Sequence, residues 1–372
     1  MEHERLRIEI DGAEIEELYP DLLSLEVELD EELAGMFRMQ IGLPQQEDGS
    51  WRHLDDERLA PWTPVTIKAD FDSGEEELIA GYITHLRIDF CGEPTQCMLE
   101  VSGMDGSVLM DREDKLKAWA NKKDSDIAQE ILRSYGFSPE AEDTGIVHDE
   151  AVSTIVQRET DMQLLRRLAL RNGFECFVEG ARGFFRAPQI DADPQPVLAA
   201  HFGDETNLAR FVAEVNALTP ANVAMSQVDR LSKEILDAAV DSGSEPVLGD
   251  TGAAGLLAPG MTAGQVHVAM SVATGPAEMT ALCRGLFHRG QWFVTVQGAV
   301  DAARYGHVLR PRRTVPIKGV GETYSGLYYV SHVTHRFTDC AYAQEFRARR
   351  NALRPTGDEP FEGDSGLLGA LL

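Results

Sequence analysis

Positive charge is scarce in this chain of 372 residues. Its 34 lysines and arginines stand against 62 aspartates and glutamates, so the formal net charge is −28. A nucleic-acid-binding protein needs a basic surface to neutralise phosphates, and an anionic membrane surface repels an acidic protein. We therefore expect no nucleic acid among the partners and no insertion into a membrane.

Cysteine and long apolar runs are scarce as well. The five cysteines form no Cys-x-x-Cys pair, and for a cytoplasmic protein free thiols are favoured even for Cys91 and Cys97, which would face each other across a hairpin. No apolar run is long enough for a membrane-spanning helix, and the N-terminal residues lack the apolar stretch of a secretory signal. We expect synthesis and assembly in the cytoplasm.

Sequence signatures of catalysis are missing too. The chain has no Gly-x-Ser-x-Gly elbow, no His-Glu-x-x-His helix and no phosphate-binding Gly-x-x-x-x-Gly-Lys loop. His332 and His335 lie three residues apart in a predicted strand, where they point to opposite faces and cannot bind one ion without a bulge. The sequence predicts no catalytic residue, no metal site and no cofactor site, which favours a protein that is not an enzyme.

Short strands separated by turn residues dominate residues 1–110. Turns such as Asp11-Gly12 and Gly92-Glu93-Pro94 favour a barrel over parallel units with crossover helices. We interpret this part as a first β-barrel domain. Its predicted strands span residues 6–10, 23–29, 36–42, 65–71, 78–90 and 95–103.

Residues 111–205 have a different pattern, which predicts an inserted α+β module. One helix is expected over residues 126–135, and a second begins after the N-cap Thr160 and ends at Gly173. A hairpin of residues 174–179 and 183–187 follows. On the second helix and just before it, four arginines are expected to pair with acidic neighbours rather than with phosphate: Arg158, Arg166, Arg167 and Arg171.

The rest of the chain is again rich in predicted strands. Residues 206–264 are expected to return to the first barrel and to end in a linker rich in Gly, Ala, Ser and Pro. Residues 265–353 are expected to form a second β-barrel domain that includes a helix from Pro276 to Gly290. Residues 354–372 are predicted to be a flexible tail.

An internal similarity links the two predicted barrels. Residues 83–90 match residues 330–337 in residue type at the first four positions and the last. Upstream of them, Val65-Thr66-Ile67-Lys68 is similar to Val315-Pro316-Ile317-Lys318. The hypothesis is a mainly β protein with two related barrels and an α+β insertion.

The stretch from Gln157 to Phe174 carries a family pattern beyond a capped helix. It reads Gln-x-Glu-Thr-Asp, then Leu-Leu-Arg-Arg-Leu-Ala, then Asn-Gly-Phe, and it resembles the phage late control protein D and VgrG-like baseplate hub family. A later segment, Gly326-Leu327-Tyr328-Tyr329-Val330, resembles the closing barrel of the same family. The resemblance implies a structural role for Gln157, Glu159, Thr160, Asp161, Leu165, Leu168, Gly173, Gly326, Tyr328 and Val330.

The resemblance also implies an assembly. Hubs of this family are homotrimers, and their two related barrels per subunit form a pseudo-hexameric ring that joins the six-fold inner tube to a three-fold spike. No oligosaccharide-binding-type domain or needle repeat follows Leu353, so we expect the spike to be a separate trimeric protein. The expected partners are this spike, the inner tube protein ring and other baseplate components.

Two functions from other classes stay open at this point. One is a cell-wall hydrolase carried at a tail tip, and the other is a glycan-binding tail module. The expected place of the protein is the baseplate of a phage tail or of a phage-derived contractile injection system, since all of these machines use such a hub.

Overall fold

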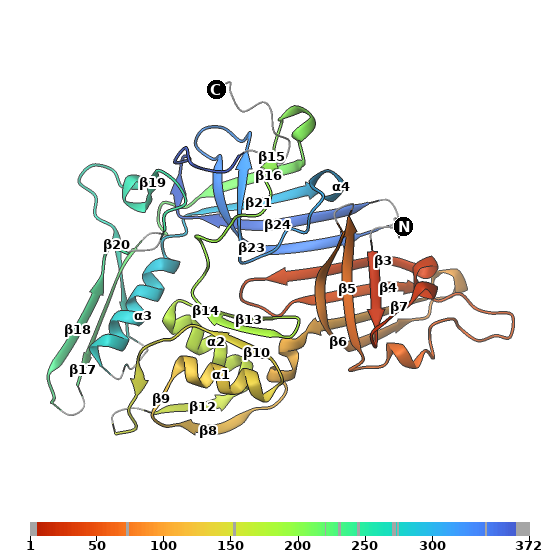
Figure 1. Ribbon diagram of the computed structural model, residues 1–372, viewed down its shortest axis with the longest axis horizontal. Coiled ribbons are helices and arrows are strands. Elements are labelled where there is room, and N and C mark those ends of the chain that lie inside the picture. The colour runs from red at the N-terminus through yellow and green to blue at the C-terminus, as the bar shows by residue number, and fades with distance from the viewer. Residues whose placement is uncertain are drawn as a thin grey trace.

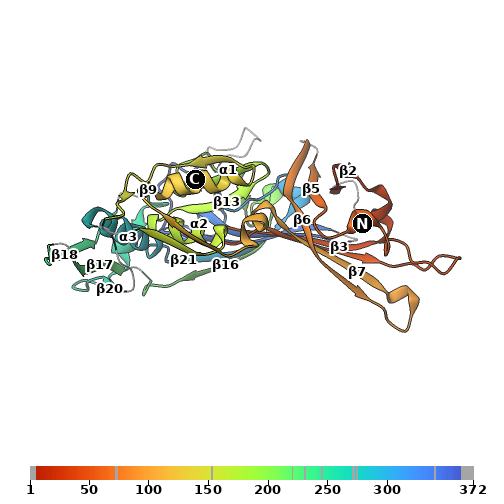
Figure 2. The same cartoon turned by 90° about the horizontal axis from the view of Figure 1, so that it is seen from below.

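One long β-sheet runs through the molecule, and the helices lie to one side of it. The computed structural model describes residues 6–71, 74–151, 154–219, 221–229, 232–243, 246–269, 273, 275–338 and 341–361. The main sheet has 13 strands, and the molecule is elongated, with the N-terminal strands at one end (Figures 1 and 2). The fold is mainly β, as predicted.

The N-terminal half of the sheet contains every strand that the sequence predicts there. In space the strands follow the order β3-β4-β7-β6-β5-β1-β2, and short 3-10 helices connect some of them. The strands are β1 (Leu6–Ile10), β2 (Ala13–Glu14), β3 (Leu22–Asp30), β4 (Met36–Gly42), β5 (Pro64–Phe71), β6 (Gly74–Asp89) and β7 (Met98–Asp105).

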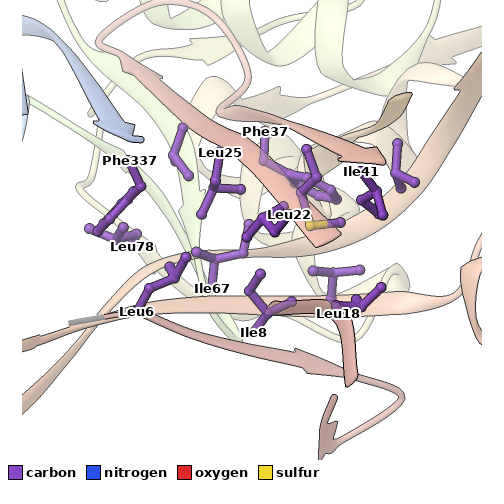
Figure 3. Close-up of a cluster of buried hydrophobic side chains, with 14 of the residues drawn as sticks. Leu6, Ile8, Leu18, Leu22, Leu25, Phe37, Ile41, Ile67, Leu78 and Phe337 are labelled. Carbon is purple, nitrogen blue, oxygen red and sulfur yellow. The ribbon is translucent and has the colours of Figure 1, made fainter. Parts of the chain in front are cut away.

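Every second side chain of these strands points to the same side of the curved sheet, where these side chains form a common hydrophobic core. Ile8, Leu25, Phe37 and Ile67 are almost completely buried there, because successive residues of a strand point to opposite faces. Figure 3 shows Phe337, from the far end of the sequence, close to this cluster. The core of the N-terminal half is therefore completed by the C-terminal half.

The inserted module has its own core and two of the predicted helices. α1 (Asp124–Ser134) and α2 (Asp161–Asn172) pack over a small sheet of β10 (Ser138–Ala141), β14 (Arg182–Arg186) and β13 (Glu175–Glu179). Two ribbons complete the module: β8 (Lys115–Trp119) with β12 (Ile155–Glu159), and β9 (Lys122–Lys123) with β11 (Val147–His148).

The C-terminal half continues the main sheet. Its strands are β15 (Leu198–Ala199), β16 (Leu208–Val215), β21 (Val294–Asp301), β22 (Thr314–Lys318), β23 (Gly326–Phe337) and β24 (Tyr342–Arg350). The predicted third helix, α3 (Pro276–Arg289), packs on a separate sheet of β17 (Ala221–Val228), β18 (Ile235–Val240) and β20 (Gly264–Val268). The minor elements are β19 (Thr251–Gly252), β25 (Ala352–Leu353) and α4 (Ala302–Tyr305).

Two expectations about the barrels are corrected by the strand pairing. Residues 206–264 do not return to the first barrel, because β16 pairs with β21 of the C-terminal half and β17 with β18 and β20. Nor do the described strands close two separate barrels, since β23 pairs with β3 and joins both halves into one sheet. Alternation along a strand shows which face is buried but does not identify the neighbouring strand.

The two halves of the sheet nevertheless repeat one arrangement. β3, β4, β7, β6 and β5 lie side by side in this order, and β16, β21, β24, β23 and β22 do the same. Both sets also follow the same order along the chain, from β3 to β7 and from β16 to β24. We call these sets the N-terminal and C-terminal half-sheets.

Backbone details repeat as well. The backbone N–H of Trp62 donates to Ile83, and that of Arg312 donates to Val330 at the matching place. Trp62 and Arg312 both have a positive φ, 71° and 61°, which is uncommon outside glycine.

The irregularities of the paired strands recur too. The β6–β7 pairing shifts after Ile83, and the β23–β24 pairing shifts after Val330. These residues begin the two segments whose sequences match, so the structure supports related halves, although not as closed barrels.

Candidate functional site

A network of buried polar groups surrounds the N-terminus of α2, where the family pattern lies. The Gln157 side chain accepts a hydrogen bond from Trp119 Nε1 at 3.0 Å and donates one to Asp161 Oδ1 at 2.8 Å. The other oxygen of Asp161 accepts from Tyr135 at 2.8 Å and pairs with Lys115. One carboxylate therefore links α2 to α1 and to the β8–β12 ribbon.

Electrostatics keeps Asp161 charged in this network. Burial alone would raise the pKa of its carboxyl, but hydrogen bonds from Lys115, Gln157 and Tyr135 outweigh burial and hold the pKa below its ordinary value. Thr160 caps the helix, because its hydroxyl accepts from the backbone N–H of Gln163 at 3.2 Å. These groups orient one another, and both oxygens of the Asp161 carboxylate have hydrogen-bond or ion-pair partners.

The remaining pattern residues of α2 pack or end the helix. Leu165 and Leu168 are fully buried in the module core, and Glu159 accepts from Arg167 at 2.8 Å. Gly173 ends the helix with φ +71°, and a Cβ atom on it would lie 2.9 Å from the Cα of Gly285 in α3. Glycine is thus required twice here, by the backbone conformation and by the close helix contact.

Gly326, Tyr328 and Val330 lie elsewhere, on β23. Tyr328 and Val330 are fully buried, and Gly326 has φ +142° where any Cβ would collide with the guanidinium of Arg350. That buried guanidinium donates to the backbone oxygens of Leu248, Ser325 and Arg354. The structure therefore places the predicted residues in two separate structural clusters, not in one site.

The predicted arginine and histidine environments can also be compared with the structure. Arg167 pairs with Glu159, and Arg171 pairs with Asp124 and Glu278, which confirms ion pairing for these two arginines.

The two histidines of β23 have different surroundings. His332 lies 3.1 Å from a carboxylate oxygen of Asp30, whereas His335 is fully buried and lies 2.9 Å from the hydroxyl of Tyr342. Across the described ranges, no group of three possible metal ligands is found.

One large cavity was not predicted from the sequence. It measures about 910 Å³ and lies where the β3–β4 loop, β13, α3 and β24 meet. Its lining is mainly apolar, but it includes Glu31, Glu175 and Arg349. Glu175 follows Phe174 and precedes Cys176 and Phe177, so a charge within an apolar run was the available signal.

The carboxyls of this cavity have perturbed acidity. Burial raises the pKa of Glu31 to about 7, although the nearby positive charge of Arg349 lowers it. Burial also raises the pKa of Glu175. Glu31 lies 2.9 Å from a guanidinium nitrogen of Arg349, although its geometry is that of an ion pair and not of a hydrogen bond. Glu175 accepts a hydrogen bond from Tyr329. Each carboxyl therefore has a structural partner.

No helix in the described part of the chain is long and apolar enough to cross a membrane. This statement concerns helices alone.

Comparisons with known proteins agree on the fold. The 43 kDa tail protein of prophage MuSo2 from Shewanella oneidensis is 13% identical, with a TM-score of 0.66 over 94% of this chain and 99% of that one. A tail protein from Neisseria meningitidis MC58 is 14% identical, with a TM-score of 0.64 over 93% of this chain and 96% of that one. At such identities the likeness shows the fold alone.

A third similar structure comes from a secretion system. The E. coli c3393 protein, a component of the type VI secretion system, is 13% identical, with a TM-score of 0.57 over 94% of this chain and 79% of that one. No curated protein matches the sequence. The chain thus has the fold of phage tail and type VI secretion proteins. A family model described as the Alg8 N-terminal domain matches residues 2–339, and the chain belongs to that family.

Proposed function

We propose that this protein is a structural, non-catalytic baseplate hub of a contractile tail or injection system, of the late control protein D type. The observation that carries the proposal is a fold shared with a prophage tail protein along 94% of this chain and 99% of that one. The matched E. coli protein is described as structurally similar to the T4 tail proteins gp27 and gp5. A role in tail or baseplate architecture fits both similarities.

The internal repeat supports a mechanism of symmetry adaptation. Three copies of a chain with two equivalent half-sheets supply six near-equivalent units, so a three-fold ring can face a six-fold tube. The two half-sheets share strand order and backbone irregularities. In this proposal one side of the homotrimer binds the inner tube ring, and the other side binds a separately encoded trimeric spike and further baseplate proteins.

The direct test is reconstitution of the hub with its neighbours. The full chain would be co-expressed with the tube and spike proteins encoded near it, and complexes would be imaged by electron microscopy. We expect a ring bound to tube on one side and spike on the other. Failure of the chain to bind either protein would contradict the proposal.

The rival reading is a tail-tip cell-wall hydrolase, and one observation favours it. Two carboxyls with raised pKa, Glu31 and Glu175, line the same cavity, an arrangement that acid catalysts also use. Digestion of purified cell wall that is abolished by Glu31→Gln or Glu175→Gln would establish the rival. For a glycan-binding module, the discriminating result would be specific sugar binding without trimerisation.

A further inference from the structure

Among the described strands, none neighbours the second part of β6 on one of its two edges. On this edge the first part of β6 pairs with β5. The backbone hydrogen bonds on this side end at Ile83, whose carbonyl accepts from Trp62 and whose N–H donates to Thr63. The rest of β6 pairs with β7 alone among the described strands. Near this edge two large apolar side chains are half exposed, Ile88 at 50% and Phe90 at 52%.

The matching edge of the C-terminal half-sheet is covered. Val330 holds the same position in β23 as Ile83 in β6, and the residues after it pair with β3. In that pairing His335 lies opposite Val27, and Phe337 lies opposite Leu25. All four of these side chains are buried. The chain therefore contains its own example of what covers such an edge.

The second open edge belongs to β16, the counterpart of β3. β16 lies at one end of the strand order of the main sheet, and β21 is its one neighbour among the strands that the structure describes. The match is close, because the β3–β4 pairing shifts between Leu22 and Ser24 and the β16–β21 pairing shifts between Leu208 and Arg210. Val212 on this strand is 45% exposed.

We propose that β6 of one chain pairs antiparallel with β16 of a second copy, repeating the β23–β3 pairing between subunits. The register of the β23–β3 pairing predicts the register between subunits, because β6 is equivalent to β23 and β16 to β3. The pair His335–Val27 corresponds to Ile88 opposite Ala213 of the partner subunit. The pair Phe337–Leu25 corresponds to Phe90 opposite Phe211 of the partner subunit. The apolar side chains that are half exposed in the single chain are buried in this contact.

Charges on the opposite face of the strands fit the same register. Arg87 lies opposite the partner subunit's Glu214, where the internal pairing places Thr334 opposite Glu28. Asp89 lies opposite the partner subunit's Val212 and diagonal to the partner subunit's Arg210, which is within reach for long side chains. A slip by one residue would bring apolar side chains to the wrong face.

The contact is head-to-tail, because each copy uses its β6 edge once and its β16 edge once. Such contacts propagate until the ring closes. Six half-sheets in three copies then form one continuous belt in which every β6 edge is paired with a β16 edge. The number three rests on the proposed hub function, whereas the pairing of the two edges rests on the internal repeat.

Cysteine cross-linking tests the register in the full chain. We would combine Asp89→Cys with Val212→Cys in a Cys91→Ser background, since Cys91 is exposed nearby. Directly opposite residues in an antiparallel pair lie close enough for a disulfide. After mild oxidation the variant should migrate as covalent dimers and closed trimers, and return to monomers on reduction. The matched control, Asp89→Cys with Ala213→Cys, should stay monomeric because Ala213 points to the other face.

A charge exchange gives a second readout that does not depend on added cysteines. Arg87→Glu should weaken self-association by up to about five-fold per contact, and adding Glu214→Arg to it should restore association. Both side chains are exposed, so folding should be unaffected.

The outcomes separate this interface from the hub function. A trimer in which the control pair cross-links as well as the test pair, or in which neither pair cross-links, overturns the edge pairing and leaves the hub intact. A chain that stays monomeric at all concentrations, alone and with the spike, overturns both.

Discussion

Glu31 makes the folding stability depend on pH in an unusual direction. Its pKa rises from 4.5 to about 7 on folding, so the folded state holds the proton more tightly, and stability falls as the pH rises through this range. The loss by neutral pH is on the order of 3 kcal/mol at most. Asp30, Glu175, Arg312 and Arg349 are the other charged groups that act on this carboxyl.

Glu31→Gln should therefore remove this part of the pH dependence. Urea denaturation at several pH values between about 4.5 and 7 would show a flatter profile for the variant than for the wild type. The control is Glu47→Gln, which changes an exposed carboxyl and should keep the wild-type profile. Parallel profiles for all three proteins would contradict the assignment.

Gly173 permits a test of close packing between α2 and α3. Gly173→Ala should destabilise the fold by roughly 2–4 kcal/mol, because it adds a clash with Gly285 to the strain of a positive φ. Gly306→Ala is the matched control, since Gly306 has φ +70° and open space around it, and it should cost only about 1 kcal/mol. Equal costs, read from urea midpoints, would show that the helix contact is not tight.

Residues whose role is local were predictable from the sequence, and those whose partners are distant were not. Thr160 and Gly173 begin and end a helix through bonds to residues within one turn, so their pattern reveals their role. Glu31 meets Arg349 only after the sheet has formed, with more than 300 residues between them. No spacing rule connects such a pair.

The polar network of Gln157 should hold α2 against the β8–β12 ribbon. Gln157→Leu leaves the buried Trp119 N–H and one oxygen of Asp161 without their partner, which should cost roughly 2–4 kcal/mol. The control is Gln163→Leu on the exposed face of α2, expected within about 0.5 kcal/mol of the wild type. A Gln157→Leu protein as stable as the control would show that the network has no structural role.

The same division between local and distant interactions explains which elements were predicted. Helices α1, α2 and α3 and the strands of the N-terminal half follow from periodicity and end signals. The partner of β16 does not, because a strand has the same alternating pattern whichever neighbour it has. Eight residues of sequence suggested that β6 and β23 are equivalent. That the neighbouring strands are equivalent too follows only from their pairing, β5 with β6 and β22 with β23.

At the scale of the whole molecule, the two equivalent half-sheets form one continuous sheet, and the net charge of the chain is −28. An acidic inner wall would repel nucleic acid and acidic cargo from a ring of such subunits. The open edges of β6 and β16 would expose unpaired backbone groups in an isolated chain. In the proposed ring, pairing between subunits would cover these backbone groups.

The most direct test of the hub account is the mass of the purified full chain by light scattering, alone and with the spike protein. The account predicts three times the 41.0 kDa of one chain, or a complex of three chains with three spike subunits. A mass of one chain under both conditions, at every concentration measured, would contradict it.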